Sequence, residues 1–415
     1  MPPPPDTAEA RVRALLRAVE RGEGVEEAAR SLLLRPLGED AIETDPGLPP
    51  SLSDLARGAL DGSLPPEVIL EGLRRWLPPP EAPRYDIGGR LGRGGMADVL
   101  LAVDAHMHRE VAIKRLRGDL TTPGRVTRFL QEAQIIAQLE HPNIVPVYDV
   151  GFEEDGRPWF VMKRVRGRSI AELLADGDLG STRRRLDILC KVCDAVAFAH
   201  SRGVLHRDLK PGNVMVGAYG EVLVMDWGLA KVVAQPQDPD AARPVETDTP
   251  DPTGYGQVRG TPAYMPPEQA RGDVDRVGQQ ADVYAIGALL YALLAGVAPY
   301  AGDDPFEILA AVQSGMMEAP NQRADAADIP EELEAVILKA MAFDPEARYP
   351  DVLTLRAELQ AWIDGRPLAS VDYTRQELLR KWAWRNRFRL RIAAAAAALV
   401  LVAVLGVVVA VLVAR

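Results

Sequence analysis

The sequence predicts an α+β fold of two lobes, a β-rich lobe followed by a helical one. A partly helical region is expected before it and a transmembrane helix after it. From Tyr85 onward the chain shows short β-rich runs, and from about Ile170 it shows long helical ones. Strands grouped ahead of helices are typical of α+β folds. At the far end, residues 392–414 are 23 consecutive apolar residues without a charge.

The composition is that of an ordinary globular protein and excludes several classes. Hydrophobic residues make up 47% of the 415 residues and charged residues 26%, which argues against a disordered, collagenous or coiled-coil chain. Two cysteines are too few for a disulfide-framed scaffold or a cysteine-rich zinc module. Because the net charge is −11, we expect no nucleic-acid partner.

Residues 1–84 form the first predicted region. They contain 14 of the 34 prolines, with clusters at Pro2–Pro5 and Pro78–Pro80. Stretches between these clusters, such as Leu52–Trp76, have the apolar spacing of a helix. We expect a small, Pro-rich and partly helical region here. Disorder is the alternative, and no catalytic motif is visible.

The next segment carries two modest signals for phosphate binding. A glycine-rich loop lies between two strand-like runs, and its residues are Leu91, Gly92, Arg93, Gly94, Gly95, Met96, Ala97, Asp98 and Val99. Glycines let a backbone close over a polyphosphate where a Cβ would obstruct it. A later strand includes Ala112 and ends in Lys114, which can neutralise phosphates if an acid such as Glu132 holds it. Each signal is weak alone, since glycine hairpins and edge lysines are common.

A far more specific cluster follows at His206–Asn213. Asp208 can accept the proton of an attacking hydroxyl, and Lys210 can stabilise the charge of a moving phosphoryl group. Asn213 offers a carbonyl oxygen to Mg²⁺, and Asp226 supplies a second oxygen ligand. These residue types at this spacing predict chemistry on phosphate.

Taken in order, the motifs resemble those of eukaryotic-like (Hanks-type) protein kinases, and most closely the bacterial serine/threonine kinases with a single transmembrane helix. The resemblance covers residues 85–364 and includes the later motifs Pro267-Glu268, Asp282-Val283-Tyr284 and Arg348. It implies the bilobal protein-kinase fold and transfer of the γ-phosphoryl group of Mg-ATP to protein serine and threonine hydroxyls. The alternative is a membrane-anchored pseudokinase that binds nucleotide as a scaffold. Its hallmark would be the loss of a catalytic residue, and none is lost.

The resemblance also implies individual roles. Its catalytic residues are the base Asp208, Lys210, the phosphate anchor Lys114 and its partner Glu132. Its metal ligands are Asn213 and Asp226. Its nucleotide site comprises the glycine loop (Leu91–Val99), Ala112, Lys114, the gatekeeper Met162 and the hinge residues Lys163 and Val165. Glu268 and Arg348 are expected to form a buried ion pair. Two departures, Ala97 for a glycine and Trp227 for a phenylalanine, remove no catalytic atom.

The segment between Asp226 and Glu268 suggests regulation. It spans 43 residues, and residues 232–253 within it carry five acidic side chains and one basic one. By resemblance, Arg207 would pair with a phosphorylated residue here, with Thr253 expected and Thr247 and Thr249 as alternatives. An insertion without function is the competing interpretation.

Some groups are expected to be structural. Cys190 and Cys193 lie in an apolar helical run, so their thiols should be core groups rather than a metal or redox pair. His206 should be a hydrogen-bonded core residue of the catalytic loop, and neither a base nor a ligand.

The C-terminal tail differs from the rest. Residues 371–415 carry eight basic and two acidic side chains, and we divide the tail into a basic juxtamembrane segment (365–391) and a transmembrane helix (392–414). Basic residues on one flank predict a single-pass protein with its N-terminal region and kinase domain in the cytoplasm. The expected partners are protein substrates, ATP, the membrane and a second copy of the chain in a homodimer. Whether an extracytoplasmic part follows Arg415 stays open.

Overall fold

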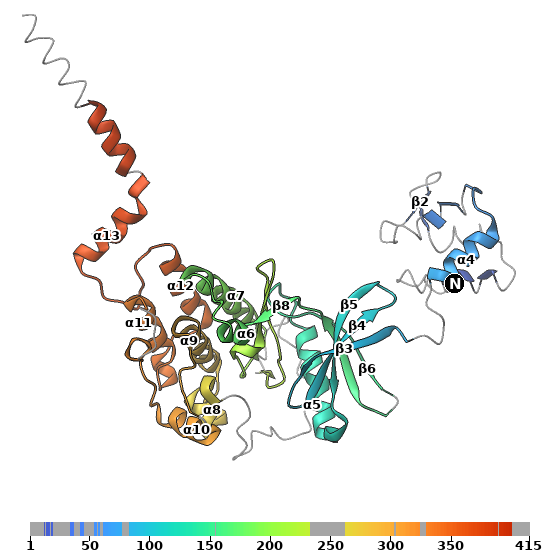
Figure 1. Ribbon diagram of the computed structural model, residues 1–415, viewed down its shortest axis with the longest axis horizontal. Coiled ribbons are helices and arrows are strands. Elements are labelled where there is room, and N and C mark those ends of the chain that lie inside the picture. Colours follow the sequence, from blue (N-terminus) through green and yellow to red (C-terminus); the bar gives the residue numbers. More distant parts are fainter. Residues whose placement is uncertain are drawn as a thin grey trace, which may run out of the picture. The chain divides into compact units, whose positions relative to one another are not determined.

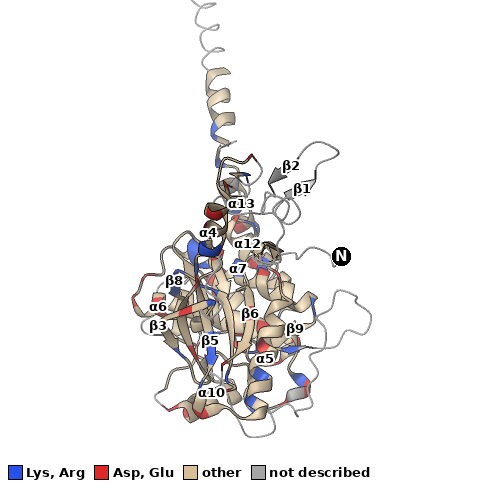
Figure 2. Cartoon of the chain, turned by 90° about the vertical axis from the view of Figure 1, so that its right-hand side faces the viewer, with Lys and Arg blue, Asp and Glu red and all other residues tan. Residues whose placement is uncertain are grey.

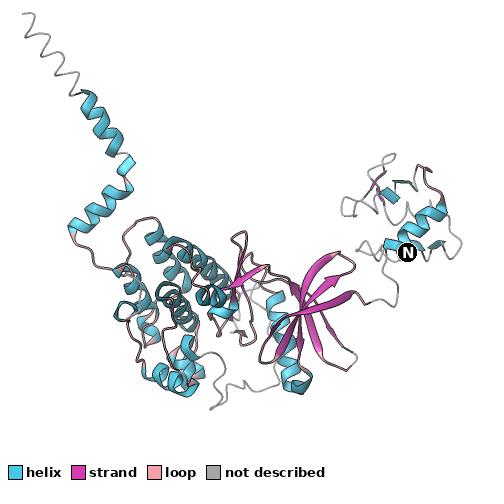
Figure 3. Ribbon diagram, in the orientation of Figure 1, coloured by secondary structure: helices cyan, strands magenta, loops and turns pink. Residues whose placement is uncertain are grey.

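The computed structural model describes residues 61–76, 83–153, 155–232, 262–302, 304–323, 329–388 and 390–400, together with short pieces between residues 12 and 58. The chain consists of two compact units, residues 1–114 and residues 115–415. Strands dominate the described chain up to residue 163 and helices dominate it thereafter (Figure 3). The predicted α+β class, strands first and helices later, is therefore confirmed.

The first unit begins with the proline-rich region. Helix α4 (Pro66–Trp76) lies inside the stretch that was expected to be helical, and it buries Ile69 and Leu73. Two short strands, β1 (Leu34–Pro36) and β2 (Ile42–Thr44), pair antiparallel in the same region. This pair was not predicted, because strands of three residues are too short to show an alternating pattern.

A five-stranded sheet forms the β-rich part, and its strands are ordered β3 (Tyr85–Arg93), β4 (Ala97–Asp104), β5 (Arg109–Leu116), β7 (Pro158–Lys163) and β6 (Val147–Phe152). Strands β3 and β4 form an antiparallel hairpin in which Tyr85 lies opposite Asp104. The third strand, β5, buries the consecutive residues Val111, Ala112 and Ile113. A strand covered on both faces needs no polar alternation, which explains this continuous apolar run.

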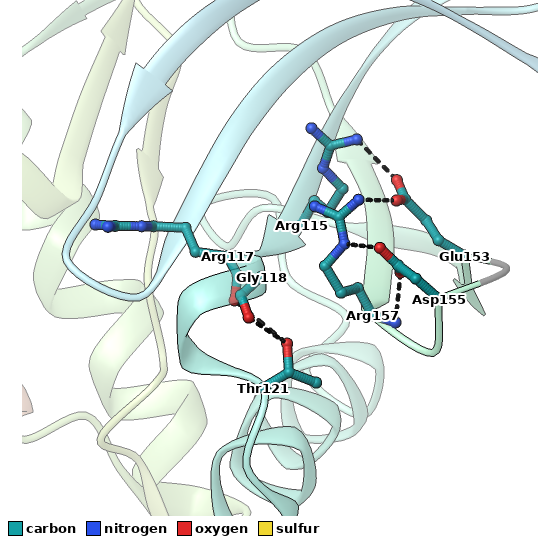
Figure 4. A network of polar contacts seen from close by, with 7 residues as sticks. All are labelled: Arg115, Arg117, Gly118, Thr121, Glu153, Asp155 and Arg157. Atoms are coloured by element: carbon teal, nitrogen blue, oxygen red, sulfur yellow. Dashed lines mark hydrogen bonds and ion pairs between the residues drawn. The ribbon is translucent and has the colours of Figure 1, made fainter.

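The second unit begins at Arg115 with a polar network (Figure 4). The carboxylate of Glu153 accepts hydrogen bonds from Arg115 at 2.8 Å and from Arg157 at 2.6 Å. Asp155 accepts another from Arg157 at 2.6 Å. These contacts join the end of β5 to the turn between β6 and β7, directly ahead of helix α5 (Pro123–Ala137).

Helices and short strands make up the remainder of the second unit: β8 (Gly167–Ser169), α6 (Ile170–Ala175), α7 (Thr182–Ser201), β9 (Val204–Leu205), β10 (Val214–Gly217), β11 (Val222–Val224), β12 (Lys231–Val232), α8 (Pro267–Arg271), α9 (Gln279–Ala295), α10 (Pro305–Ser314), α11 (Glu331–Ala340), α12 (Val352–Ile363) and α13 (Arg375–Arg385) (Figure 1). Helix α9 is the core element, since all of its residues from Ala281 onward are buried. It ends at Gly296, whose φ of +77° is a left-handed conformation that glycine adopts without strain.

Two of the structural expectations can be judged here. Cys190 and Cys193 are buried on α7 as expected, and burial raises the pKa of Cys190 to about 11, so these thiols stay protonated. Within the described part of the chain, no helix is both long and apolar enough to cross a membrane. Residues 391–400 are helical, whereas residues 401–414 of the expected span lie outside the described residues.

Candidate active site

The catalytic loop follows β9 and leads into the 3₁₀ turn Pro211–Asn213. Strands β10 and β11 then form an antiparallel hairpin, with Val214 opposite Val224. The hairpin brings the chain back, and the backbone N–H of Met225 donates to the carbonyl of Asn213 at 2.8 Å. Asp226 is thereby returned to the neighbourhood of the loop, although several residues separate the two motifs in the sequence.

Asp208 is held by two side chains of its own loop. Its Oδ2 accepts a hydrogen bond from Lys210 Nζ at 2.7 Å and another from Asn213 Nδ2 at 3.2 Å. Burial raises the pKa of Asp208, and the charge of Lys210 opposes that rise. Both hydrogen bonds fall on Oδ2, and no described residue bonds to Oδ1, so Oδ1 is the oxygen left to accept a proton. A carboxylate of raised basicity with one oxygen held in place is suited to general-base catalysis.

Asn213 and Asp226 fit a divalent cation. Asn213 uses its amide nitrogen on Asp208, with bonds of 2.8 Å to the backbone carbonyl and 3.2 Å to Oδ2. Its side-chain oxygen takes part in neither bond and is the atom a hard cation prefers. The part of the chain that the structure describes has no cluster of three His, Cys, Asp or Glu side chains able to hold a metal. Asn213 and Asp226 would hold such an ion through one amide oxygen and one carboxylate oxygen.

His206 has the structural position that the sequence predicted. It is fully buried, its Nδ1 accepts from the backbone N–H of Asp208 at 3.2 Å, and its Nε2 lies 3.1 Å from the carbonyl of Met225. Burial lowers the pKa of His206, so the ring is neutral at physiological pH. The indole of Trp227 packs against it with 4.5 Å between ring centroids. His206 therefore ties the catalytic loop to the Asp226 segment.

Asp282 on α9 is the anchor of the catalytic loop. Its carboxylate is fully buried and accepts hydrogen bonds from the backbone N–H groups of His206 at 2.9 Å and Arg207 at 2.8 Å. His200 Nε2 lies 2.7 Å from the same carboxylate. Arg207 has a φ of +66°, which a residue with a side chain adopts only when neighbouring contacts enforce it. Gln269 adds a further contact, because its Nε2 donates to the Arg207 carbonyl at 2.9 Å.

The expected buried ion pair is present behind this region. Arg348 Nη1 and Nη2 lie 2.7 Å and 2.8 Å from the two carboxylate oxygens of Glu268. Both side chains are almost completely buried. The bidentate geometry explains how two charges are tolerated in the core.

The glycine loop and Lys114 belong to the first unit. The loop lies in the β3–β4 hairpin, where the N–H of Gly94 donates to the carbonyl of Ala97 at 2.8 Å, Arg93 lies opposite Asp98 and Gly92 opposite Val99. Leu91 is exposed, Gly95 and Met96 form the turn, Ala112 is buried on β5 and Lys114 is half-buried. The contact of Lys114 with Glu132 stays a prediction.

Glu132 lies on α5 and is buried. A Cβ at Gly228 would come within 3.3 Å of Glu132 Oε2 and 3.5 Å of Asp226 Oδ1. The absence of a side chain at Gly228 therefore leaves room for the carboxylates of Glu132 and Asp226 to approach its backbone.

The expected gatekeeper Met162 and the expected hinge residues Lys163 and Val165 lie at the end of β7 and just after it. Met162 is buried, and Val165 is half-buried. The backbone N–H of Lys163 already donates to the carbonyl of Pro146 at 3.1 Å, and its side chain pairs with Glu221 at 2.8 Å. The adenine contact of the hinge stays a prediction.

A cavity opens beside the catalytic loop, lined by Asp208, Lys210, Tyr264, Met265 and Gln269, among others. The threonines expected as phosphorylation sites, Thr247, Thr249 and Thr253, lie outside the described residues. Sequence reasoning gave no role to Asp282 or Gln269. A carboxylate inside the otherwise apolar helix α9 was the signal that could have identified Asp282.

Comparison with known proteins agrees with this geometry. Residues 85–357 match the family model described as the protein kinase domain. The serine/threonine-protein kinase PknB of Mycobacterium leprae (strain TN) is 38% identical over 295 residues, which cover 70% of this chain and 44% of that protein. The probable serine/threonine-protein kinase SCO3848 of Streptomyces coelicolor (strain ATCC BAA-471 / A3(2) / M145) is 37% identical, with 69% and 41% covered. The serine/threonine-protein kinase PknD of Protochlamydia amoebophila (strain UWE25) is 35% identical, with 68% and 30% covered.

The chain thus spans less than half the length of these relatives. The family match nevertheless covers more than half of the chain, and it includes the catalytic loop, the Asp226 segment and the Glu268–Arg348 pair. The chain belongs to the protein kinase family, and residues 85–357 form a protein kinase domain of the serine/threonine type.

Proposed function

We propose that this chain transfers the γ-phosphoryl group of Mg-ATP to serine or threonine hydroxyls of protein substrates. One observation carries the proposal. Lys210 and Asn213 both bind Oδ2 of Asp208, which leaves Oδ1 to receive the hydroxyl proton of a substrate. A pseudokinase would have no need of this arrangement.

Each catalytic side chain has a defined task in this reaction. Asp208 orients the hydroxyl and accepts its proton as the oxygen attacks phosphorus. The Lys210 ammonium balances the charge of the transferred group, while Asn213 and Asp226 offer oxygens to Mg²⁺. When bound, Mg²⁺ neutralises the charge that develops on the phosphate oxygens.

The test is phosphate transfer by the full chain and by Asp208→Asn. We expect transfer to fall by about 10³-fold, within the range that general-base catalysis contributes. Asp187→Asn makes the same change at an exposed position of α7 and should retain full activity. Equal phosphate incorporation by all three proteins would refute the proposal and favour the scaffold.

We also propose that the kinase is a single-pass membrane protein whose catalytic domain faces the cytoplasm. The support is the run of 23 apolar residues at 392–414 behind a basic segment. The full chain should stay in membranes through a high-salt wash, and a chain that ends at Arg391 should be extracted by it. Retention of both proteins would contradict the anchor.

Activation by autophosphorylation is the third part of the proposal. Its support is the position of Thr253 in the acidic segment between Asp226 and Glu268, with Thr247 and Thr249 as alternatives. Mass spectrometry of active protein should find phosphate on one of these threonines. Phosphate elsewhere with all three unmodified would exclude this mechanism. Homodimer formation stays a prediction.

A further inference from the structure

The segment that follows α12 is bound to the helical part of the kinase domain. The carboxylate of Glu358 accepts hydrogen bonds from the backbone N–H groups of Ala369 at 2.8 Å and Ser370 at 3.1 Å, and also from the Ser370 hydroxyl. The Tyr373 hydroxyl accepts another from the N–H of Leu368, which is itself buried. The first part of the expected juxtamembrane segment is therefore an ordered extension of the domain.

Helix α13 starts from this extension and is clamped to α11. Thr374 and Glu377 form a capping box at its start, with Thr374 N donating to Glu377 at 2.7 Å and Glu377 N donating to Thr374 Oγ1 at 3.3 Å. One turn later, Lys381 Nζ lies 2.7 Å from Glu332 Oε1 and 5.2 Å from the centre of the Tyr373 ring. Both charged side chains of the pair are mostly buried. These contacts fix how α13 is rotated about its axis.

The side of α13 turned away from this clamp is apolar and exposed. Leu379, two residues before Lys381, lies on the opposite side, because two residues turn an α-helix by about 200°. Its exposed fraction is 66%, and that of Trp382 is 49%. By the same geometry Trp382 lies about 60° from Leu379 around the helix, and we call Leu379 and Trp382 the outer face.

Positive charge accompanies the outer face. Residues 371–400 contain seven basic and two acidic side chains. Figure 2 colours the basic residues of the described chain blue and the acidic ones red. Leucine and tryptophan beside arginine and lysine form the pattern of helices that lie in the headgroup region of a bilayer. Helix α13 leads away from α11 toward the apolar residues that begin at Ile392 (Figure 1). The basic charge and this continuity favour a lipid surface over an acidic protein as the occupant.

We propose that the outer face of α13 binds the surface of an anionic bilayer, and that the Lys381–Glu332 clamp thereby holds the kinase domain in one orientation at the membrane. The inference rests on the proposed membrane anchoring. It goes beyond anchoring, because a flexible linker would let the domain turn freely above the bilayer. With α13 held at both surfaces, only substrates that approach the exposed side of the domain can be phosphorylated.

The test is amide hydrogen exchange of the full chain, reconstituted in nanodiscs of phosphatidylcholine alone or with 30% phosphatidylglycerol. Each basic residue near an anionic surface is worth about a fivefold gain in binding. We therefore expect amides of residues 375–391 to exchange at least about tenfold more slowly in the anionic discs, and high salt should remove the difference. Equal exchange in both discs would overturn the proposal.

Two variants test the face itself. The double variant Leu379→Glu and Trp382→Glu should lose the protection while keeping its capping box and its clamp. As a control, Phe306→Glu places a glutamate on an exposed apolar residue of α10 and should keep the protection. Protection that survives the double variant would overturn the proposal.

The outcomes also separate this inference from the proposed membrane anchoring and the proposed kinase activity. A chain that fails to enter nanodiscs but sediments with anionic vesicles supports the outer face and overturns the anchor. A chain that does neither overturns both. Slow exchange that appears only after an acidic protein is added would assign the face to that protein instead. Kinase activity is measured on the same samples, so loss of the catalytic assignment is seen independently.

Discussion

Replacement of Asp282 by asparagine tests how the catalytic loop is held. In the wild-type protein, Oδ2 of Asp282 faces His200 Nε2 and the N–H of His206, while Oδ1 faces the N–H of Arg207. Burial disfavours the charge of this carboxylate, yet these hydrogen bonds hold the pKa of Asp282 below its usual value. The ionised group is therefore the stable one at neutral pH. Asparagine has the same shape but must point an N–H₂ group at one of these donors.

The magnitude follows from the two backbone bonds. One of them is lost outright, which costs about 1.5–3 kcal/mol for a bond to a charged group. The other weakens to a neutral bond, which costs about 1 kcal/mol more. His200 can change tautomer and so adds little. We expect Asp282→Asn to lower the free energy of unfolding by about 3 kcal/mol.

The effect on the rate comes through Arg207. Its φ of +66° is maintained by the bond from its own N–H to Asp282, and Asp208 is the next residue. A displacement of the base by about 1 Å can lower kcat by about 100-fold. Urea unfolding at pH 7 and steady-state phosphate transfer would measure both effects.

A matched substitution provides the control. Asp351→Asn makes the same change at the N-cap of α12, where asparagine caps a helix as well as aspartate does, so both quantities should stay near wild type. The reasoning would be refuted if Asp282→Asn unfolded within about 1 kcal/mol of wild type and kept kcat within about threefold.

Three further predictions concern the same domain. Lys210→Met removes the charge that opposes the raised pKa of Asp208, so the acid limb of the pH–rate profile should move to higher pH; an unmoved limb would contradict this. Burial lowers the pKa of His206 in the folded protein. Below about pH 6.5 the unfolded chain therefore binds a proton on this ring that the folded chain does not, so the free energy of unfolding, measured in urea, should decrease between pH 7 and pH 5. Arg348→Met leaves the Glu268 carboxylate buried alone and should cost about 3–5 kcal/mol, most of which Glu268→Leu in the same chain should restore.

The chemistry of the site could be predicted from the sequence because it is local. Asp208, Lys210 and Asn213 lie within six positions, and a short hairpin returns Asp226 to them. Such contacts need no knowledge of the tertiary fold. The burial of Cys190 and Cys193 could be predicted for the same reason, because their place in an apolar helical run assigned them to the core.

The supports of the site could not be predicted in the same way. Asp282 reaches His206 across 76 positions, and Lys381 reaches Glu332 across 49. Nothing in the local sequence indicates which distant side chain will accept the hydrogen bond from His206 or from Lys381. Hydropathy and charge likewise mark residues 365–391 as a basic juxtamembrane segment, but they do not indicate that Glu358 and Glu332 bind residues of this segment to the domain.

Strain links these supports to function. The two non-glycine residues in the active site with positive φ, Arg207 at +66° and Asp226 at +57°, adjoin the catalytic base and provide the expected metal ligand. Each such conformation costs about 1–3 kcal/mol, so it persists only where the surroundings enforce it. For Arg207 the enforcing group is Asp282. When that bond is lost, relief of strain returns part of the free energy, so Asp282→Asn should impair the rate more severely than its effect on stability suggests.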